Sequence, residues 1–206
     1  MKKYELTEET KVIDGKTLFR IRALRSFGDI KAGDLGGFIE NERNLSHEDN
    51  AWVSGNAKVI DNARVSDNAL VSGETWVGGN ARVDGNARVS GNARVIDNAR
   101  VSGYAKVGGK AIVGGEAWVS GEAQVSDDGL INSNNDYLYE KGLGSHNRPA
   151  SFFKCKDRHI HVLCGCFDGN LDEFENKVKE EHGNSKYAKE YLGFIEVVKT
   201  HFEVCQ

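Results

Sequence analysis

A six-residue repeat runs from Ala51 to Asp128 without a single insertion or deletion. The segment divides into thirteen hexads of the form A-x-V-x-[G/D]-z. The first position is alanine in twelve hexads and Thr75 in the other, and the third position is valine in all thirteen. A repeat of this strictness requires a structure in which every hexad adopts the same backbone conformation and stacks on its neighbours.

Each position of the hexad has a physical role. Valine is β-branched and favours extended backbone, and the alternation of a strand sends the first and third residues to the same side. Gly-Asn and Asp-Asn pairs tolerate left-handed backbone and therefore mark corners. A helical period of 3.6 residues is absent, which excludes helical repeats. The pattern predicts a solenoid of short strands and corners around a narrow core of alanine and valine.

Hexads such as "VSGNAK" from Val53 and "VDGNAR" from Val83 resemble the hexapeptide-repeat proteins, in which an aliphatic residue is followed four positions later by a small one. The resemblance implies a parallel left-handed β-helix with three hexads per coil. The repeat phase extends back to Leu45 and forward through a degenerate hexad at Gly129. We therefore expect the solenoid over residues 45–134, as five coils of eighteen residues each.

Residues 1–44 are expected to form an N-terminal β-hairpin cap over one open end of the solenoid. Asp14 and Gly15 lie between two alternating segments and predict the hairpin turn. The segment "DLGGFIE" that follows is interpreted as a turn-rich entry loop. Its glycines do not form a phosphate-binding motif.

Residues 135–206 are expected to form a small C-terminal α+β domain of ββαα type. Two strands are predicted around Lys156-Asp157-Arg158, followed by two helices. Asn170 and Glu173 form a capping-box pair at the start of the first helix. The predicted fold class is therefore mainly β: a solenoid with a β cap and an α+β domain.

The order of these segments, including "GSHNR" and "GCFDGNLDEFENKVKEEHG", resembles proteins encoded in phages and prophages. That resemblance implies a cytoplasmic location in an infected or lysogenic bacterial host. The net charge of −4 and the pI of about 5.9 give no global basic field for long nucleic acid. No segment is typical of a signal peptide or a membrane span, so no membrane partner is expected.

With three hexads per coil, outward residues eighteen apart stack on one face. One face carries isoleucine and tryptophan among its outward residues: Lys58, Ile60, Trp76, Arg94, Ile96 and Ile112. Large apolar side chains that point away from a core are expected to be covered. Because hexapeptide-repeat proteins are commonly trimers, the resemblance implies a homotrimer packed through this face.

A second face carries Arg64, Arg82, Arg100 and Trp118, with Asp84 beside them. Adjacent arginines about 4.8 Å apart repel by about 0.8 kcal/mol in water. One explanation is that Asp84, acids of a neighbouring subunit and solvent offset the charge. The other is an anionic ligand in a cleft between subunits, since arginine forks bind phosphates or carboxylates and Trp118 can stack on a ring.

The segment "GSHNR" supplies a second candidate site for ligand binding, consisting of Ser145, His146, Asn147 and Arg148. A hydroxyl, an amide and a fixed cation beside a flexible glycine suit anion recognition better than proton transfer. The alternative interpretation is an ordinary polar linker.

Catalytic and metal-binding patterns are weak. The only histidine of the coils, His47, lies in inward phase and is interpreted as structural. His159 and His161 share a strand face without evident carboxylate company. The cysteines do not have the spacing of zinc knuckles and are interpreted as reduced, packed thiols: Cys155, Cys164, Cys166 and Cys205. No catalytic residue, metal or cofactor is predicted.

Together these observations predict a non-catalytic trimeric binding protein of phage type that recognises a small anionic, nucleotide-like ligand. One specific version is sequestration of a nucleotide signal of host defence. The first alternative is an acyl-CoA-dependent acyltransferase with His47 or His146 as base, because many hexapeptide-repeat proteins are acyltransferases. The second alternative is a structural phage scaffold that binds only protein.

Overall fold

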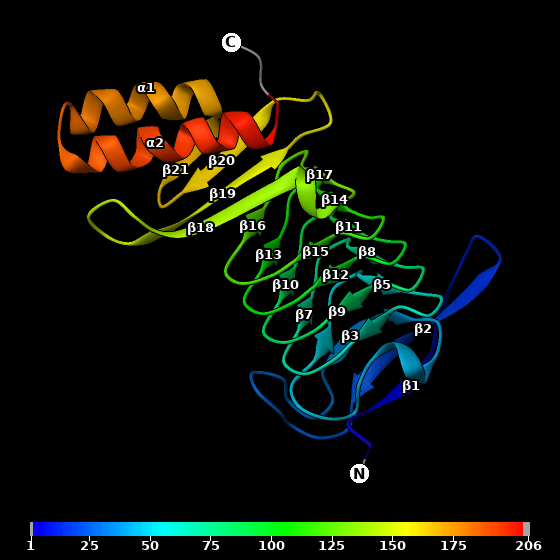
Figure 1. Cartoon of the computed structure of the whole chain (residues 1–206). Helices are drawn as coiled ribbons and strands as arrows, with labels where there is room; N and C mark the ends of the chain where they lie inside the picture. The colour runs from blue at the N-terminus through cyan, green and yellow to red at the C-terminus, as the bar shows by residue number, and fades with distance from the viewer. Residues whose placement is uncertain (1, 204–206) are drawn as a thin grey trace.

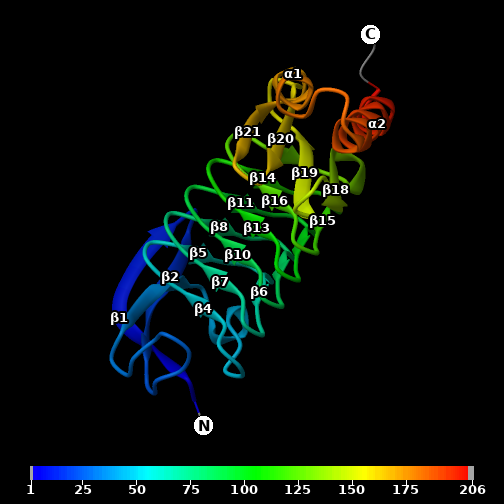
Figure 2. The ribbon, with the colours of Figure 1, turned by 90° about the vertical axis from the view of Figure 1, so that its left-hand side faces the viewer.

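The computed structural model describes residues 2–203 and shows a stack of coils with a hairpin at one end and a two-helix domain at the other (Figure 1). Figure 2, turned by 90°, shows the hairpin running along one side of the first coils. Fourteen two-residue strands, β4 to β17, build a parallel β-solenoid of about five turns. No helix among residues 2–203 is long and apolar enough to cross a lipid bilayer.

Three parallel sheets form the walls of the solenoid, and we name each by its outward residues. The isoleucine face contains β5 (Lys58–Val59), β8 (Trp76–Val77), β11 (Arg94–Val95), β14 (Ile112–Val113) and β17 (Leu130–Ile131). The arginine face contains β6 (Arg64–Val65), β9 (Arg82–Val83), β12 (Arg100–Val101) and β15 (Trp118–Val119). The mixed face contains β4 (Trp52–Val53), β7 (Leu70–Val71), β10 (Arg88–Val89), β13 (Lys106–Val107) and β16 (Gln124–Val125). Strands eighteen residues apart pair in register, which confirms three hexads per coil.

The predicted roles of the hexad positions are confirmed. The first- and third-position residues are all buried in one continuous core. All thirteen fifth-position residues have φ between 49° and 75°, the left-handed region. At Gly73 a side chain would also meet the next coil, because a Cβ there would lie 2.6 Å from the carbonyl oxygen of Gly91. At three of the four aspartate corners, Asp61, Asp67 and Asp97, the carboxylate accepts a hydrogen bond from the next coil. Asp97 Oδ2, for example, accepts from Gly115 N–H at 3.0 Å.

The N-terminal hairpin consists of β1 (Tyr4–Ile13) and β2 (Lys16–Ala23), with its turn at Asp14 and Gly15 as predicted. β3 (Leu35–Ile39) pairs antiparallel with β2 and parallel with β5, so the hairpin extends the sheet of the isoleucine face. The interpretation of "DLGGFIE" as a loop is therefore wrong. A Cβ at Gly37 would lie 2.6 Å from the carbonyl oxygen of Ala57, so this glycine permits close packing within a strand.

The hairpin also covers part of the isoleucine face. Ile60 is buried and packs with Leu18 of β2 and Phe38 of β3, and Trp76 packs against the same cluster. Farther along this face Ile96 and Ile112 remain half-buried. The apolar residues that motivated the trimer are thus covered in part by the same chain.

The C-terminal region contains four antiparallel strands instead of the two predicted. In order they are β18 (Tyr137–Leu143), β19 (Arg148–Lys154), β20 (Ile160–Cys164) and β21 (Phe167–Asn170), followed by α1 (Leu171–His182) and α2 (Lys186–His201). The sequence analysis missed β18 and β21, and "GSHNR" is the hairpin turn between β18 and β19 rather than a linker. The capping box is confirmed, because Asn170 Oδ1 accepts from Glu173 N–H and Glu173 Oε2 accepts from Asn170 N–H, both at 2.9 Å.

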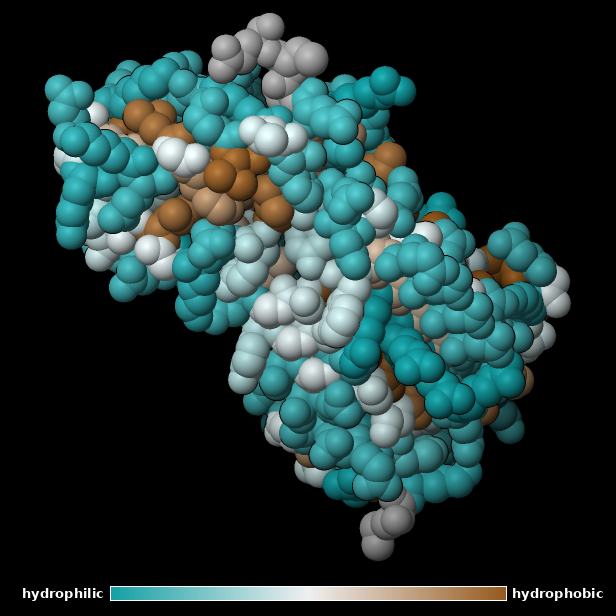
Figure 3. All heavy atoms as spheres, in the orientation of Figure 1, coloured by the Kyte–Doolittle hydropathy of each residue, from teal (hydrophilic) through white to brown (hydrophobic). Residues whose placement is uncertain are grey.

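The two helices cover one side of this sheet through a second core that includes Phe152, Phe174, Ile195 and Val198. Hydrophobic residues gather over this two-helix layer, whereas the coils seen from the same side are mainly hydrophilic (Figure 3). Phe153, next to Phe152 on β19, points the other way and joins the core of the solenoid. The domain is therefore attached to the last coil by a shared core.

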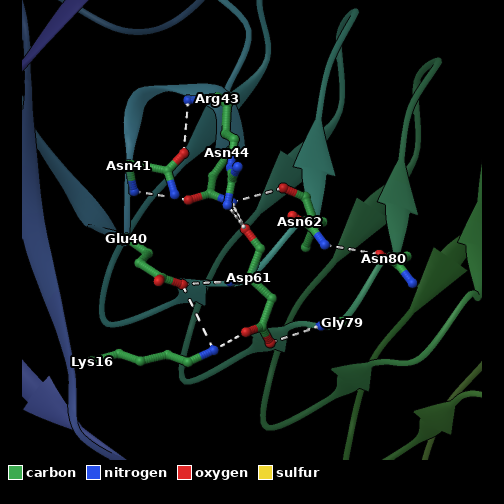
Figure 4. Close-up of polar contacts among 10 residues, drawn as sticks. Lys16, Glu40, Asn41, Arg43, Asn44, Asp61, Asn62, Gly79 and Asn80 are labelled. Atoms are coloured by element: carbon green, nitrogen blue, oxygen red, sulfur yellow. Dashed lines mark hydrogen bonds and ion pairs between the residues drawn. The ribbon is translucent and has the colours of Figure 1, made fainter.

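Side chains complete the backbone ladder at both ends of the solenoid. Between coils, each N–H bonds a carbonyl of the coil that follows, so the first coil has free carbonyls and the last coil has free N–H groups. At the start, the 3-10 turn Glu42–Asn44 ends in the buried Asn44, whose Nδ2 donates to the carbonyls of Asp61 at 3.1 Å and Ala63 at 2.9 Å (Figure 4). At the other end, Ser151 Oγ accepts from Gln124 N–H at 2.8 Å.

Lys3 contributes to the same cap. It is fully buried, and its Nζ donates to the carbonyl oxygen of Ala51 at 2.8 Å and of Glu48 at 3.1 Å. Burial, together with the nearby Arg25, lowers the pKa of Lys3 to about 8. Burying an amine costs free energy unless its hydrogen bonds are satisfied. The bonds from Lys3 Nζ to the carbonyls of Glu48 and Ala51 offset that cost and supply the first coil with a donor.

We expect Asn44→Leu to lower the free energy of unfolding by about 2–4 kcal/mol, because each buried group left without a partner costs about 1–3 kcal/mol. The Ala63 carbonyl loses its donor, the Asn41 N–H loses its acceptor, and the Asp61 carbonyl keeps only the 3.4 Å bond from Arg43. Urea denaturation measures the difference. Asn62→Leu is the matched control, since Asn62 is exposed and bonds only Asn80, and it should change the value by less than about 0.5 kcal/mol. Equal losses in the two variants would contradict the capping role of Asn44.

Candidate anion site on the arginine face

The ladder of the arginine face is present as predicted. Arg64 pairs in register with Arg82, Arg82 with Arg100, and Arg100 with Trp118. All four side chains are exposed. These residues therefore form one column along the solenoid, one residue per coil.

Arg100 is neutralised within the chain. Its guanidinium donates to both carboxylate oxygens of Asp84, at 3.0 and 3.2 Å. It also lies 5.1 Å from the ring centroid of Trp118, whose indole Nε1 donates to Ser102 Oγ at 2.7 Å. For Arg100, the neighbouring carboxylate of Asp84 is thus sufficient to offset the positive charge, and no anionic ligand is required there.

Arg64 and Arg82 differ from Arg100, because neither forms an ion pair with any residue of the described range 2–203. They border an open groove of about 520 Å³ between the first coils and the N-terminal cap. Its polar lining also includes Arg43, Ser46, His47 and Ser66. The sequence analysis did not include Arg43, which precedes the repeat, or Ser46, which lies in the irregular hexad that begins at Leu45.

The two acids of the groove already have cationic partners. Glu42 accepts from Lys2 Nζ at 2.6 Å, and hydrogen bonding from Lys2 lowers the pKa of Glu42. Asp84 is held by Arg100. The positive charge of Arg64 and Arg82 therefore faces the groove without compensation from these carboxylates.

His47 lies in the same groove but is held as a structural side chain. Its ring stacks on Tyr4 with centroids 4.3 Å apart, and its Nδ1 accepts from Lys3 N–H at 3.2 Å. A neutral ring that accepts at Nδ1 carries its proton on Nε2. Burial lowers the pKa of His47, which favours that neutral form. Neither nitrogen is then free to accept a proton from a substrate, so the structural interpretation is supported.

The second set of predicted ligand residues lies elsewhere. Ser145, His146 and Arg148 border a separate pocket of about 320 Å³ between the β18–β19 turn and the two helices. Ser145 Oγ lies 2.9 Å from His146 Nδ1, and Asn147 has φ of 48°, so Asn147 serves as a turn residue. The structure does not bring this set together with the arginine face.

Three of the four cysteines can be compared with their prediction. Cys155 is buried and Cys164 is half-buried, and burial raises the pKa of both thiols, to about 12 for Cys155. Cys166 is exposed in the turn between β20 and β21, so its interpretation as a packed thiol is wrong. Cys205 lies outside the described residues.

The prediction that no carboxylate lies beside His159 and His161 is also wrong. His159 Nδ1 lies 2.5 Å from Asp157 Oδ1, and His161 Nε2 lies 2.7 Å from Asp168 Oδ1. Asp168 belongs to β21, a strand that the sequence analysis missed, so its neighbour on β20 could not be identified.

We expect Arg82→Gln to raise the free energy of unfolding by a few tenths to about 1 kcal/mol at low salt. Arg82 lies between Arg64 and Arg100 in the column. Asp84 offsets the charge of Arg100, so the main repulsion on Arg82 comes from Arg64 and is about 0.8 kcal/mol in water. The matched control Arg100→Gln should instead lower the free energy of unfolding by up to about 1 kcal/mol, because the ion pair of Arg100 with Asp84 is lost. Urea denaturation at low salt and at 1 M salt measures both effects, which should shrink at high salt. Destabilisation by Arg82→Gln would mean that its charge is already compensated.

One comparison with known proteins supports the repeat. A family model described as the YdcK beta solenoid repeat matches residues 63–79 and 87–109. No curated protein matches the chain. The matched segments lie within the coils, and together with the three parallel sheets they identify the chain as a β-solenoid repeat protein.

Proposed function

We propose that this protein is a binding protein that recognises a small anionic ligand on its arginine face. One observation supports this most strongly: Arg64 and Arg82 stack in register at a groove whose two acids, Glu42 and Asp84, already have other partners. Like charges held about 4.8 Å apart cost free energy, and a phosphate or carboxylate between them removes that cost.

The donors around the groove suit an oxyanion. Two guanidinium groups offer planar forks that bind phosphate with two hydrogen bonds each. The hydroxyls of Ser46 and Ser66 and the guanidinium of Arg43 border the same groove. Among residues 2–203 the Arg43 guanidinium bonds only the carbonyl oxygen of Asp61, at 3.4 Å, so its charge adds to the positive field of the groove.

The position of Trp118 favours a nucleotide among such anions. Trp118 lies two coils beyond Arg82 in the same column, about 10 Å away. Its ring is 47% exposed and is fixed by Ser102, so it offers a stacking surface without much loss of side-chain entropy. A ligand that spans both positions would place phosphate on the arginines and a base on the indole. The sequestration of a host defence signal is the narrower form of this proposal.

The proposal includes no chemical step. The neutral form of His47 has no free lone pair, and His146 is exposed on a hairpin turn. Neither residue resembles a positioned base, and no observation favours the acyltransferase alternative. A scaffold that binds only protein is the outcome that would remain if no small ligand binds.

Isothermal titration calorimetry with pyrophosphate, AMP, ADP-ribose and a cyclic dinucleotide tests the proposal. We expect one of these anions to bind, and the double variant Arg64→Gln/Arg82→Gln to weaken its binding by about a hundredfold or more. Each charge-assisted hydrogen bond contributes about 1.5–3 kcal/mol, and every 1.4 kcal/mol is tenfold in affinity.

Arg94→Gln is the matched control, because Arg94 is equally exposed but belongs to the isoleucine face. It should leave binding unchanged. Trp118→Ala should weaken AMP and ADP-ribose but not pyrophosphate. Absence of binding by all four anions, or equal affinity in the double variant, would rule out this site.

The homotrimer is a separate part of the proposal. It is now supported only by Ile96 and Ile112, the half-buried residues of the isoleucine face beyond the hairpin. Native mass spectrometry should report three chains, and Ile96→Lys/Ile112→Lys should yield monomers. A wild-type protein that is monomeric at micromolar concentration would contradict the trimer and leave the anion site to be judged by calorimetry.

A further inference from the structure

A cluster of metal-binding side chains lies where the last coil meets the C-terminal domain. Cys155 follows β19, His159 directly precedes β20, and His161 lies within β20. The three residues form the compact pattern C-x3-H-x-H. A turn closes this segment: Cys155 N–H donates to the carbonyl oxygen of His159 at 3.0 Å. The ligand atoms of the three residues all lie within 4.8 Å of one another.

The two imidazoles face each other at a distance that suits one ion. His159 Nε2 lies 3.4 Å from His161 Nδ1. Two nitrogens bound to one tetrahedral zinc at about 2.0–2.1 Å lie about 3.3–3.4 Å apart. The two nitrogens therefore lie at the spacing of a shared ligand set, and the Cys155 thiol lies beside them.

The other nitrogen of each ring is held by a carboxylate. His159 Nδ1 lies 2.5 Å from Asp157 Oδ1, and His161 Nε2 lies 2.7 Å from Asp168 Oδ1. An ionised carboxylate only accepts hydrogen bonds, so each of these nitrogens carries the proton of its neutral ring. When both rings are neutral, the two nitrogens that face each other are His159 Nε2 and His161 Nδ1, and each presents a lone pair. A cation bound between them would accept both lone pairs.

We infer that Cys155, His159 and His161 form a binding site for a divalent transition metal of the zinc class. A thiolate and two imidazoles are ligands that zinc prefers, and carboxylates that orient the ligating rings are typical of zinc sites. Asp157 and Asp168 are thus positioning residues.

The surroundings of the cluster suit a cation that remains accessible. The cluster borders an open groove of about 590 Å³, whose lining includes Asp127, Asp128 and Glu173. Asp127 Oδ2 also lies 3.4 Å from His161 Nε2. Cys155 is buried while His159 is exposed, so the cluster extends from the core to the surface of the groove, and an ion bound there would be accessible to solvent. Binding converts the Cys155 thiol to a metal-bound thiolate and releases one proton to solvent.

The experiment uses the full chain, stripped with EDTA and titrated with Zn²⁺ or Co²⁺. We expect one Zn²⁺ per chain by mass spectrometry of the metal content, about one proton released per ion, and a thiolate-to-Co²⁺ charge-transfer band. Cys155→Ser should lose that band, whereas the matched control Cys166→Ser, which alters an exposed thiol, should keep it.

Two further variants keep the test decisive if Cys155→Ser does not fold, since Cys155 is buried. His159→Gln alters an exposed side chain and should weaken Zn²⁺ binding by about a hundredfold or more. Asp168→Asn should weaken it by about 10–100-fold while the charge-transfer band of the loaded protein remains. The inference is overturned if the stripped protein binds neither ion, or if His159→Gln and Asp168→Asn both bind Zn²⁺ as tightly as the wild type.

Discussion

The backbone hydrogen bonds between successive coils are the interaction on which the rest of this molecule depends. They all run in one direction, from an N–H to a carbonyl of the next coil. The first coil is therefore left with carbonyls that require donors, and the last coil with N–H groups that require acceptors. The first coil needs donors, which Asn44 and Lys3 supply, and the last coil needs acceptors, which Ser151 supplies. The caps are therefore chemically distinct and not interchangeable. This accounts for an amide and a buried amine at one end and a hydroxyl at the other.

The same ladder dictates what the surface can do. Because coils stack in register, identical positions of successive coils lie about 4.8 Å apart. A residue type that is repeated along a column is therefore in contact with an identical side chain on the next coil. Asparagine benefits from this, as when Asn80 Nδ2 donates to Asn98 Oδ1 at 2.9 Å. Stacked arginines instead repel one another. In the column of Arg64, Arg82 and Arg100, the charge of Arg100 is offset by Asp84 of the preceding coil. A column of like charges therefore raises the free energy of the folded state locally, and an anion bound beside the column would lower it.

The repeat made much of the fold predictable. The thirteen corners, the inward alanines and valines, and the columns of the three faces all follow from local rules of backbone and burial. The caps were harder to predict, because β3 is a strand by virtue of its tertiary partners β2 and β5, and its glycines resemble those of a turn. The candidate sites were hardest. The column of Arg64 and Arg82 could be predicted from the repeat. The position of Arg43 at the same groove and the contact of His161 with Asp168 depend on tertiary packing that the repeat does not encode.

Both candidate sites lie where a cap meets the coils, and there is a physical reason for this. Inside the stack every coil has nearly the same surroundings, so a side chain there meets little but its own repeated neighbours. At the junctions, chain from outside the repeat comes within reach: Arg43 beside Arg64 at one end, and His161 beside Asp127 at the other. At such breaks in the repeat, groups from outside the coils converge with groups of the coils. The solenoid thus holds two different junctions apart, and each candidate site combines repeat residues, such as Arg64 or Asp127, with residues that the repeat does not contain.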